Sequence, residues 1–193
     1  NESPALLNVE VDPRGGVRRR NGVTKVNATA LTDDIISLFP HYEAGSNQIL
    51  ASVNPSTAPS TTEIYFNEDA SGDFSGPIAY SNGVLTFSGS QPARGVTFGS
   101  TSLSSVGYTY IVNGSMLVSP HDAGAAIKWN GENAPLPYDP LDPPTTYPGY
   151  LTPDLDGSDG HFPCARYVTA WAEHVWVAYT VESATTYKNR VRF

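Results

Sequence analysis

The last 29 residues of the chain, Ala165 to Phe193, read A-R-Y-V-T-A-W-A-E-H-V-W-V-A-Y-T-V-E-S-A-T-T-Y-K-N-R-V-R-F. Small apolar residues alternate with larger or polar ones over residues 168–173, and Val175 to Tyr179 is rich in strand-forming residues. A polar stretch, Glu182 to Thr186, separates these runs from a third at Asn189 to Phe193. The pattern predicts three short strands in a meander, whose edges must pair with a neighbour or be protected.

The remainder of the chain also consists of short strand-forming runs separated by turn residues. Asn-Gly, the dipeptide preferred in two-residue hairpin turns, occurs four times, at residues 21–22, 82–83, 113–114 and 130–131. These turns are irregularly spaced, so the chain has no true sequence repeat, and no long helical pattern appears. We therefore expect an all-β fold of short antiparallel strands and hairpins, forming a single β-rich region over residues 1–193.

Several individual pairings follow from the turn signals. Residues 6–11 and 17–20 are expected to be strands on either side of the turn Asp12 to Gly16. Residues 108–112 and 116–118 are likewise expected to be strands on either side of the turn Asn113-Gly114. Residues 48–53 and 63–66 are predicted partners across a Pro/Ser/Thr loop. Residues 33–39 are compatible with a strand or one helical turn, and we expect a loop at 41–46.

Composition supports an ordered protein with buried surface. The chain is 39% hydrophobic and 11% aromatic, whereas 17 Gly and 16 Pro are consistent with frequent turns. Its net charge of −8 argues against general nucleic-acid binding, and without an 18-residue apolar run we expect no membrane insertion. Because the sequence starts at Asn1 and stops within a predicted strand, we expect it to be a fragment of a longer polypeptide.

The segment 132–160 is predicted to be a long loop rich in Pro and Asp. It carries Tyr138, Tyr147 and Tyr150, and tyrosine is a frequent interface residue. Proline lowers the entropy lost when such a loop is ordered on docking. We favour a contact with another chain over a solvated loop, and these three tyrosines are interface candidates.

Arg18, Arg19 and Arg20 form the main basic cluster. In a strand, Arg18 and Arg20 point to one face and Arg19 to the other, so the cluster is divided. A solvated strand or a protein interface is therefore favoured over phosphate binding, and the three arginines are also interface candidates.

No pattern predicts a catalytic, cofactor or metal site. Asp154, Asp156 and Asp159 resemble the start of a calcium loop, but the sixth position is Asp159 and the twelfth is Ala165 where that loop needs Gly and Glu. An Asp/Gly turn is favoured. The four histidines have no metal-ligand spacing, and the single cysteine, Cys164, is expected to be an inert thiol. The residues themselves therefore assign no catalytic residue, cofactor or metal ligand.

Three phrases resemble the large β-rich structural proteins of tailed bacteriophages. Residues 1–23 resemble their opening, in which an early strand meets a Gly-Gly turn and then a basic strand. Residues 110–114 with 127–131 resemble a "Y-x-V-N-G … W-N-G" blade, and residues 166–193 resemble a further blade ending in N-R-V-R. Together these phrases span about half of the chain, with modest specificity.

The resemblance implies a β-propeller-type tail or head–tail component, similar to nozzle proteins and DNA-retaining tail proteins. Such proteins are non-enzymatic and assemble as rings with other virion proteins in the bacterial host cytoplasm, and DNA passes through without sequence-specific binding. A complete propeller needs more residues than this chain supplies, so a smaller β-sandwich remains an alternative fold.

A rival hypothesis from the residues is a carbohydrate-binding or glycan-degrading β domain that uses Trp129, Trp171 or Trp176 as a stacking platform. The virion hypothesis predicts buried tryptophans, whereas the carbohydrate hypothesis predicts at least one exposed beside acidic residues. An enzyme without a visible motif is a third possibility.

Overall fold

The computed structural model describes a chain made of β-strands. It describes residues 9–11, 17–19, 29–43, 46–67, 72–80, 83–98, 107–118, 125–129, 131, 149–151, 163–182 and 185–193. Every regular element in these ranges is a strand, and all strand pairs are antiparallel. The prediction of an all-β chain is confirmed, and none of the sheets closes into a barrel. The described residues include no helix that could cross a membrane.

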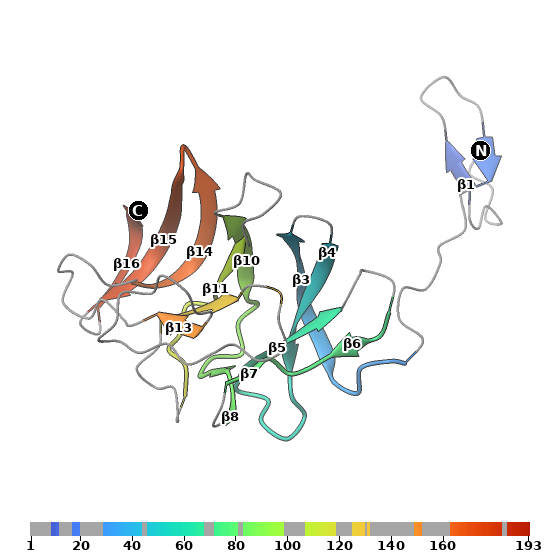
Figure 1. The fold of residues 1–193 in the computed structure, drawn as a ribbon, viewed down its shortest axis with the longest axis horizontal. Helices are drawn as coiled ribbons and strands as arrows, with labels where there is room; N and C mark the ends of the chain where they lie inside the picture. The colour runs from blue at the N-terminus through green and yellow to red at the C-terminus, as the bar shows by residue number, and fades with distance from the viewer. Residues whose placement is uncertain are drawn as a thin grey trace, which may run out of the picture.

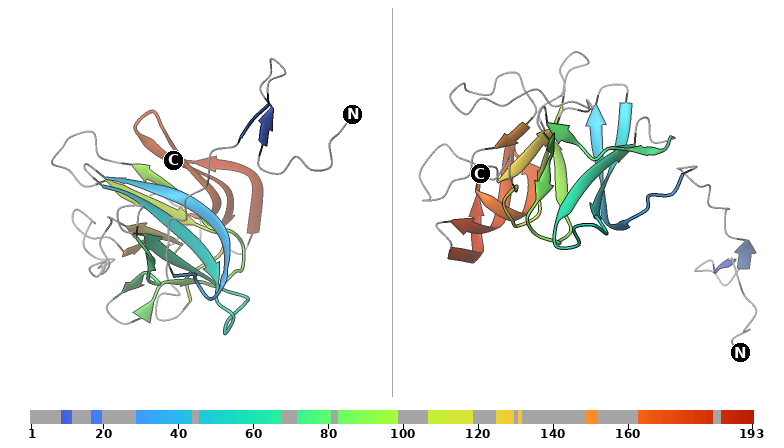
Figure 2. Two further views of the ribbon diagram at one scale, coloured as in Figure 1. Left: turned by 90° about the vertical axis from the view of Figure 1, so that its right-hand side faces the viewer. Right: turned by 90° about the horizontal axis from the view of Figure 1, so that it is seen from below.

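Strands β1 (Val9–Val11) and β2 (Val17–Arg19) form a small hairpin, with Val11 opposite Val17. The expected pairing across Asp12 to Gly16 is therefore confirmed. In Figures 1 and 2 this hairpin lies apart from the three larger sheets.

The first large sheet has strand order β3-β4-β5-β6, and β9 also pairs with β5. Its strands are β3 (Asp34–Glu43), β4 (Ser46–Asn54), β5 (Thr62–Asn67), β6 (Phe74–Ser75) and β9 (Thr86–Phe87). The predicted pairing of residues 48–53 with 63–66 is confirmed. The loop predicted at residues 41–46 is wrong at residues 41–43, which continue β3, and at Ser46, which begins β4. Pro40 does not end the strand because β3 is at the sheet edge, where a missing N–H can be tolerated.

Two Asn-Gly predictions have different outcomes. Strands β7 (Ala79–Tyr80) and β8 (Gly83–Val84) form the hairpin expected at Asn82-Gly83. The strand at 116–118 does not fold back on 108–112. Its backbone instead bonds to the β9 region, where the Val118 N–H donates to the Thr86 carbonyl at 2.9 Å. Gly114, at φ 87°, turns the chain away, and its N–H donates to the Ala165 carbonyl.

The second large sheet has strand order β10-β11-β12-β13. Its strands are β10 (Arg94–Phe98), β11 (Tyr108–Val112), β12 (Ala126–Trp129) and β13 (Gly149–Leu151). β13 lies inside the segment that the sequence predicts as a loop, and it pairs with β12 with Tyr150 opposite Ile127.

The third large sheet is the meander predicted from the C-terminal sequence. It consists of β14 (Cys164–Trp171), β15 (His174–Glu182) and β16 (Thr185–Arg192), paired in that order. Ala172 and Glu173 form the two-residue turn between β14 and β15, with φ of 49° and 64°. Two positive φ values define a type I′ turn, here without Asn or Gly.

The three sheets share one plan. Each follows the chain order of its strands, and their first strands, β3, β10 and β14, pack against each other in sequence. Figure 1 shows β10 between β3 and β14, with β6 and β16 farthest apart at the two outer ends. The third sheet also contacts β11, so the second sheet lies between the first and the third.

The main core lies between the first and second sheets. It consists of large apolar side chains from both sheets and from the 76–93 region. Its largest fully buried members are Trp129, Phe66 and Phe87. The first strands approach closely here, since a Cβ on Gly95 of β10 would lie 2.5 Å from the Phe39 ring of β3. Glycine is therefore required for this packing.

Candidate interaction surface

Exposed aromatic side chains gather on one face of the third sheet. Trp171 is 70% exposed and Phe193 is 77% exposed, and Trp176 and His174 lie between them. The ring centroid of Trp176 lies 6.0 Å from that of Trp171 and 4.8 Å from that of Phe193. The ring centroids of His174 and Phe193 are 5.3 Å apart. We call Trp171, His174, Trp176 and Phe193 the aromatic face. Large exposed apolar groups of this kind typically mark interaction sites.

The strand register explains how the aromatic face forms. Trp171 is directly opposite His174, and Thr169 is directly opposite Trp176, so these side chains share one side of the sheet. The Trp176 indole N–H donates to the Trp171 carbonyl at 2.9 Å and fixes the ring against the turn. The opposite side of the sheet carries small aliphatic residues, of which Val177 is buried. The rings are thus held in position by the strands rather than by loops.

A second exposed apolar group lies on the outer side of the first sheet. Leu38 and Tyr42 of β3 are 60% and 59% exposed, and Ile35 is also exposed. A register shift between Ile35 and Ser37 brings all three to the same side of the strand. We call Ile35, Leu38 and Tyr42 the β3 face.

Carboxylates accompany the β3 face. Glu63 of β5 is opposite Val53, which is in turn opposite Ile35, so Glu63 is on the same side of the sheet. Burial and the nearby negative charge of Asp33 raise the pKa of Glu63. Asp33 itself accepts a hydrogen bond from the Ser56 N–H at 2.8 Å, which lowers its pKa.

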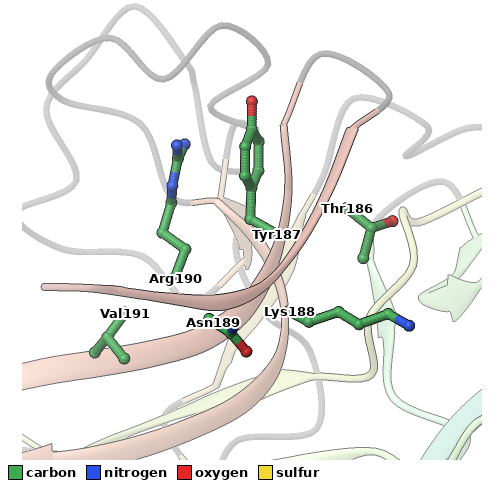
Figure 3. Close-up of a pocket in the computed structure, with 6 residues that line it drawn as sticks. All are labelled: Thr186, Tyr187, Lys188, Asn189, Arg190 and Val191. Atoms are coloured by element: carbon green, nitrogen blue, oxygen red, sulfur yellow. The ribbon is translucent and has the colours of Figure 1, made fainter.

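Cations line the outer strand of the third sheet. Figure 3 shows the side chains of Tyr187 and Arg190 together on one side of β16, with Lys188 extending away. The Arg190 guanidinium lies 3.6 Å from the centre of the Tyr187 ring and pairs with the buried Glu182. Burial alone would raise the pKa of Glu182, but hydrogen bonds from Thr180 and Arg190 and the charge of Arg192 lower it. Lys188 is exposed to solvent.

Two of the titratable residues that could have served in catalysis or metal binding, His41 and Cys164, are buried. His41 is fully buried, with its Nδ1 atom 2.7 Å from the Thr109 hydroxyl and its ring tilted against the Trp129 ring, the two ring centroids being 4.9 Å apart. Burial lowers its pKa from 6.5 to about 4, so the ring is neutral at pH 7. Cys164 is buried, which raises its pKa to about 11. A thiol with a raised pKa is protonated at neutral pH, and the expectation that Cys164 is inert stays a prediction. The described side chains contain no cluster of three or more potential metal ligands.

The predicted interface residues fall mostly outside the surface found here. Arg18 and Arg19 lie in β2 and Tyr150 lies in β13. Arg20, Tyr138, Tyr147, Asp154, Asp156 and Asp159 are outside the described residues.

Sequence reasoning did not assign the aromatic face to an interface, although the alternation in residues 168–176 could have suggested it. Of the three tryptophans, Trp129 is fully buried, Trp176 is half-buried and Trp171 is exposed, two residues before the exposed Glu173 in the chain.

Comparisons with protein-family models, with curated proteins and with solved structures each found no significant match. The chain's function must therefore be argued from its own residues.

Proposed function

We propose that this chain is a structural protein of a bacteriophage virion, a non-enzymatic component of a tail or head–tail ring, and that its three large sheets are consecutive blades of an open β-propeller. The observation that carries the proposal is the repeated plan of the sheets. Each is an antiparallel meander in chain order, apart from β9, which joins the first sheet by pairing with β5, and the first strand of the second sheet, β10, packs against both β3 and β14. In a propeller, four-stranded meanders are arranged in this way around a central axis.

The alternative β-sandwich accounts for less of this arrangement. A sandwich places two sheets face to face over one core, which would fit the first two sheets alone. The third sheet packs on β10 and β11 of the second sheet, and none of its described residues belongs to the main core. Three sheets that follow one another and contact each other through their first strands favour the propeller.

The electrostatics suit a ring that DNA passes through without being held. The net charge of −8 opposes binding to phosphates, because DNA affinity depends on cationic contacts that displace counterions. We expect the assembled protein in the virion, after assembly in the host cytoplasm, in contact with other copies and with other virion proteins.

The test is whether the protein is a stoichiometric part of virus particles. Particles purified from the source culture would be analysed by quantitative mass spectrometry and labelled with an antibody against residues 163–193. We expect peptides of this chain at a fixed ratio to the major capsid protein and antibody label at one end of the particle. Their absence from intact, DNA-filled particles would overturn the proposal.

One observation favours a second function, carbohydrate binding. Trp171 is exposed two residues before the exposed Glu173, and indole faces stack on sugar rings while carboxylates accept their hydroxyl hydrogen bonds. Titration of soluble bacterial oligosaccharides would then quench tryptophan fluorescence in the wild type but much less in Trp171→Ala. No quenching by any member of a broad glycan panel would exclude this function.

A further inference from the structure

The large apolar side chains that are exposed lie at the two ends of the series of sheets. Among the described side chains they are those of the β3 face together with Tyr167, Trp171, Val191 and Phe193 of the C-terminal region. The second sheet, between the other two, contributes none among its described side chains. Among the described residues, stacking the sheets has therefore covered each inner face and left the two outermost faces without a neighbouring sheet.

The two end faces differ in shape. The aromatic face presents flat rings from Trp171, Trp176 and Phe193, held by the register of β14 and β15. The β3 face presents the branched Ile35 and Leu38 beside Tyr42, over the small Ala51 that is directly opposite Leu38. An aromatic ridge on one end and an aliphatic face above a small residue on the other are suited to contact each other rather than themselves.

The two ends also differ in charge. Residues 29–67, which include β3 to β5, contain four carboxylates and no Lys or Arg, so their formal charge is −4. Residues 163–193 contain four cations and two carboxylates, so their formal charge is +2. Electrostatic complementarity of this kind directs which surfaces meet and suppresses contacts between like surfaces.

We infer that copies of this chain associate head to tail, with the aromatic face of one copy packed on the β3 face of the next. This inference rests on the proposed propeller and names the occupant of its open sides as a second copy.

A head-to-tail contact uses two different surfaces, so it can close into a ring. Two copies of a three-sheet chain supply six sheets, which is inside the range of roughly four to eight blades in closed propellers. Closure would bury both end faces of both copies and leave no large apolar face exposed. The expected species is a closed dimer of twice 20.7 kDa.

The test uses one charged substitution on each face, Leu38→Glu and Trp171→Glu. Both residues are mostly exposed, so each variant should fold. Ser88→Glu, at an exposed serine outside both faces, is the matched control. Mass in solution would be measured by sedimentation velocity across a dilution series, with circular dichroism to confirm the fold of each variant.

We expect the wild type and Ser88→Glu to be dimeric and each face variant alone to be monomeric. An equimolar mixture of the two face variants should regain a dimer. The intact aromatic face of Leu38→Glu can bind the intact β3 face of Trp171→Glu. That mixed dimer has one contact instead of two, so it should dissociate at much higher concentration than the wild type.

Two results would overturn the inference. A wild-type chain that stays monomeric at every concentration shows that another occupant, such as a different protein, covers these faces. A wild-type dimer that persists in one of the two face variants alone shows a contact between like faces. Particle analysis separates this from the proposed function, because a monomeric chain that is still stoichiometric in virions contradicts only the head-to-tail contact.

Discussion

Tryptophan has opposite environments at two places in the molecule. One is the core between the first two sheets, and the other is the outer side of the third sheet. Trp129 is fully buried among Phe66, His41 and aliphatic side chains of the first two sheets. Trp171 is 70% exposed on the third sheet, although it too sits on a well-paired strand. An aromatic residue on a well-paired strand is therefore not always buried in a core. What differs is whether a further sheet is present to cover that face.

The largest expected effect is on the buried side of this comparison. Trp129→Ala removes a large ring from the main core and leaves a cavity, so the free energy of unfolding should fall by about 3–5 kcal/mol. Trp171→Ala is the matched control and should cost the single chain less than about 1 kcal/mol. Urea denaturation at a concentration where the chain is monomeric measures both. Similar losses for the two variants would mean that Trp171 is buried in solution.

Acid should weaken the same core through His41. Burial lowers its pKa in the folded protein to about 4, whereas an unfolded chain binds the proton near pH 6.5. Between these values the unfolded state holds more protons, so stability is full above pH 6.5 and falls as pH drops toward 4. The loss is at most about 3.5 kcal/mol, taking about 1.4 kcal/mol for each unit of the pKa difference.

Stability measured from pH 7 to pH 4 tests this effect. His41→Gln should remove most of the slope between pH 6.5 and 4, although it also lowers the overall stability. His174→Gln, which changes an exposed histidine of the aromatic face, should keep the slope. An unchanged slope in His41→Gln would assign the acid sensitivity to carboxylates such as Glu182.

The close contact between first strands should be sensitive to a single methyl group. In Gly95→Ala the new Cβ would lie 2.5 Å from the Phe39 ring, which has little room to move in a packed core. We expect a loss of about 1–3 kcal/mol in the free energy of unfolding. Unchanged stability would mean that β3 and β10 are farther apart than described, and it would weaken the propeller arrangement.

The class of the fold was predictable because alternation and turn residues act locally. Residues 164–192 show this best: their three strands follow from a period of two and a polar interruption. The pairing of distant segments was less predictable. Residues 116–118 were expected to pair across Asn113-Gly114, but they pair with the Thr86 region because that contact completes the core around Phe87 and Leu117.

The surface was harder to predict than the strands. The sequence indicated interfaces through conspicuous local chemistry, such as the arginines at 18–20 and the prolines and tyrosines of 132–160. The aromatic face joins Trp171 to Phe193 across three strands, so it exists only once the register is set. The same is true of His41, whose neighbour Pro40 suggested a loop, while its partner Thr109 is 68 residues away.

The smallest expected effect is a gain of stability at the turn that carries the aromatic face. Ala172 and Glu173 both have positive φ, a conformation that costs residues with a Cβ about 1 kcal/mol and that Asn and Gly adopt readily. The double variant Ala172→Asn, Glu173→Gly should therefore raise the free energy of unfolding by about 1 kcal/mol. Urea denaturation of the monomer measures the gain, and the reverse order, Ala172→Gly with Glu173→Asn, is a control for lost side chains. If the gain appears and head-to-tail association is unchanged, the turn only sets the register. If association weakens while stability rises, Glu173 itself contributes to the contact, and the aromatic face extends to the tip of the hairpin.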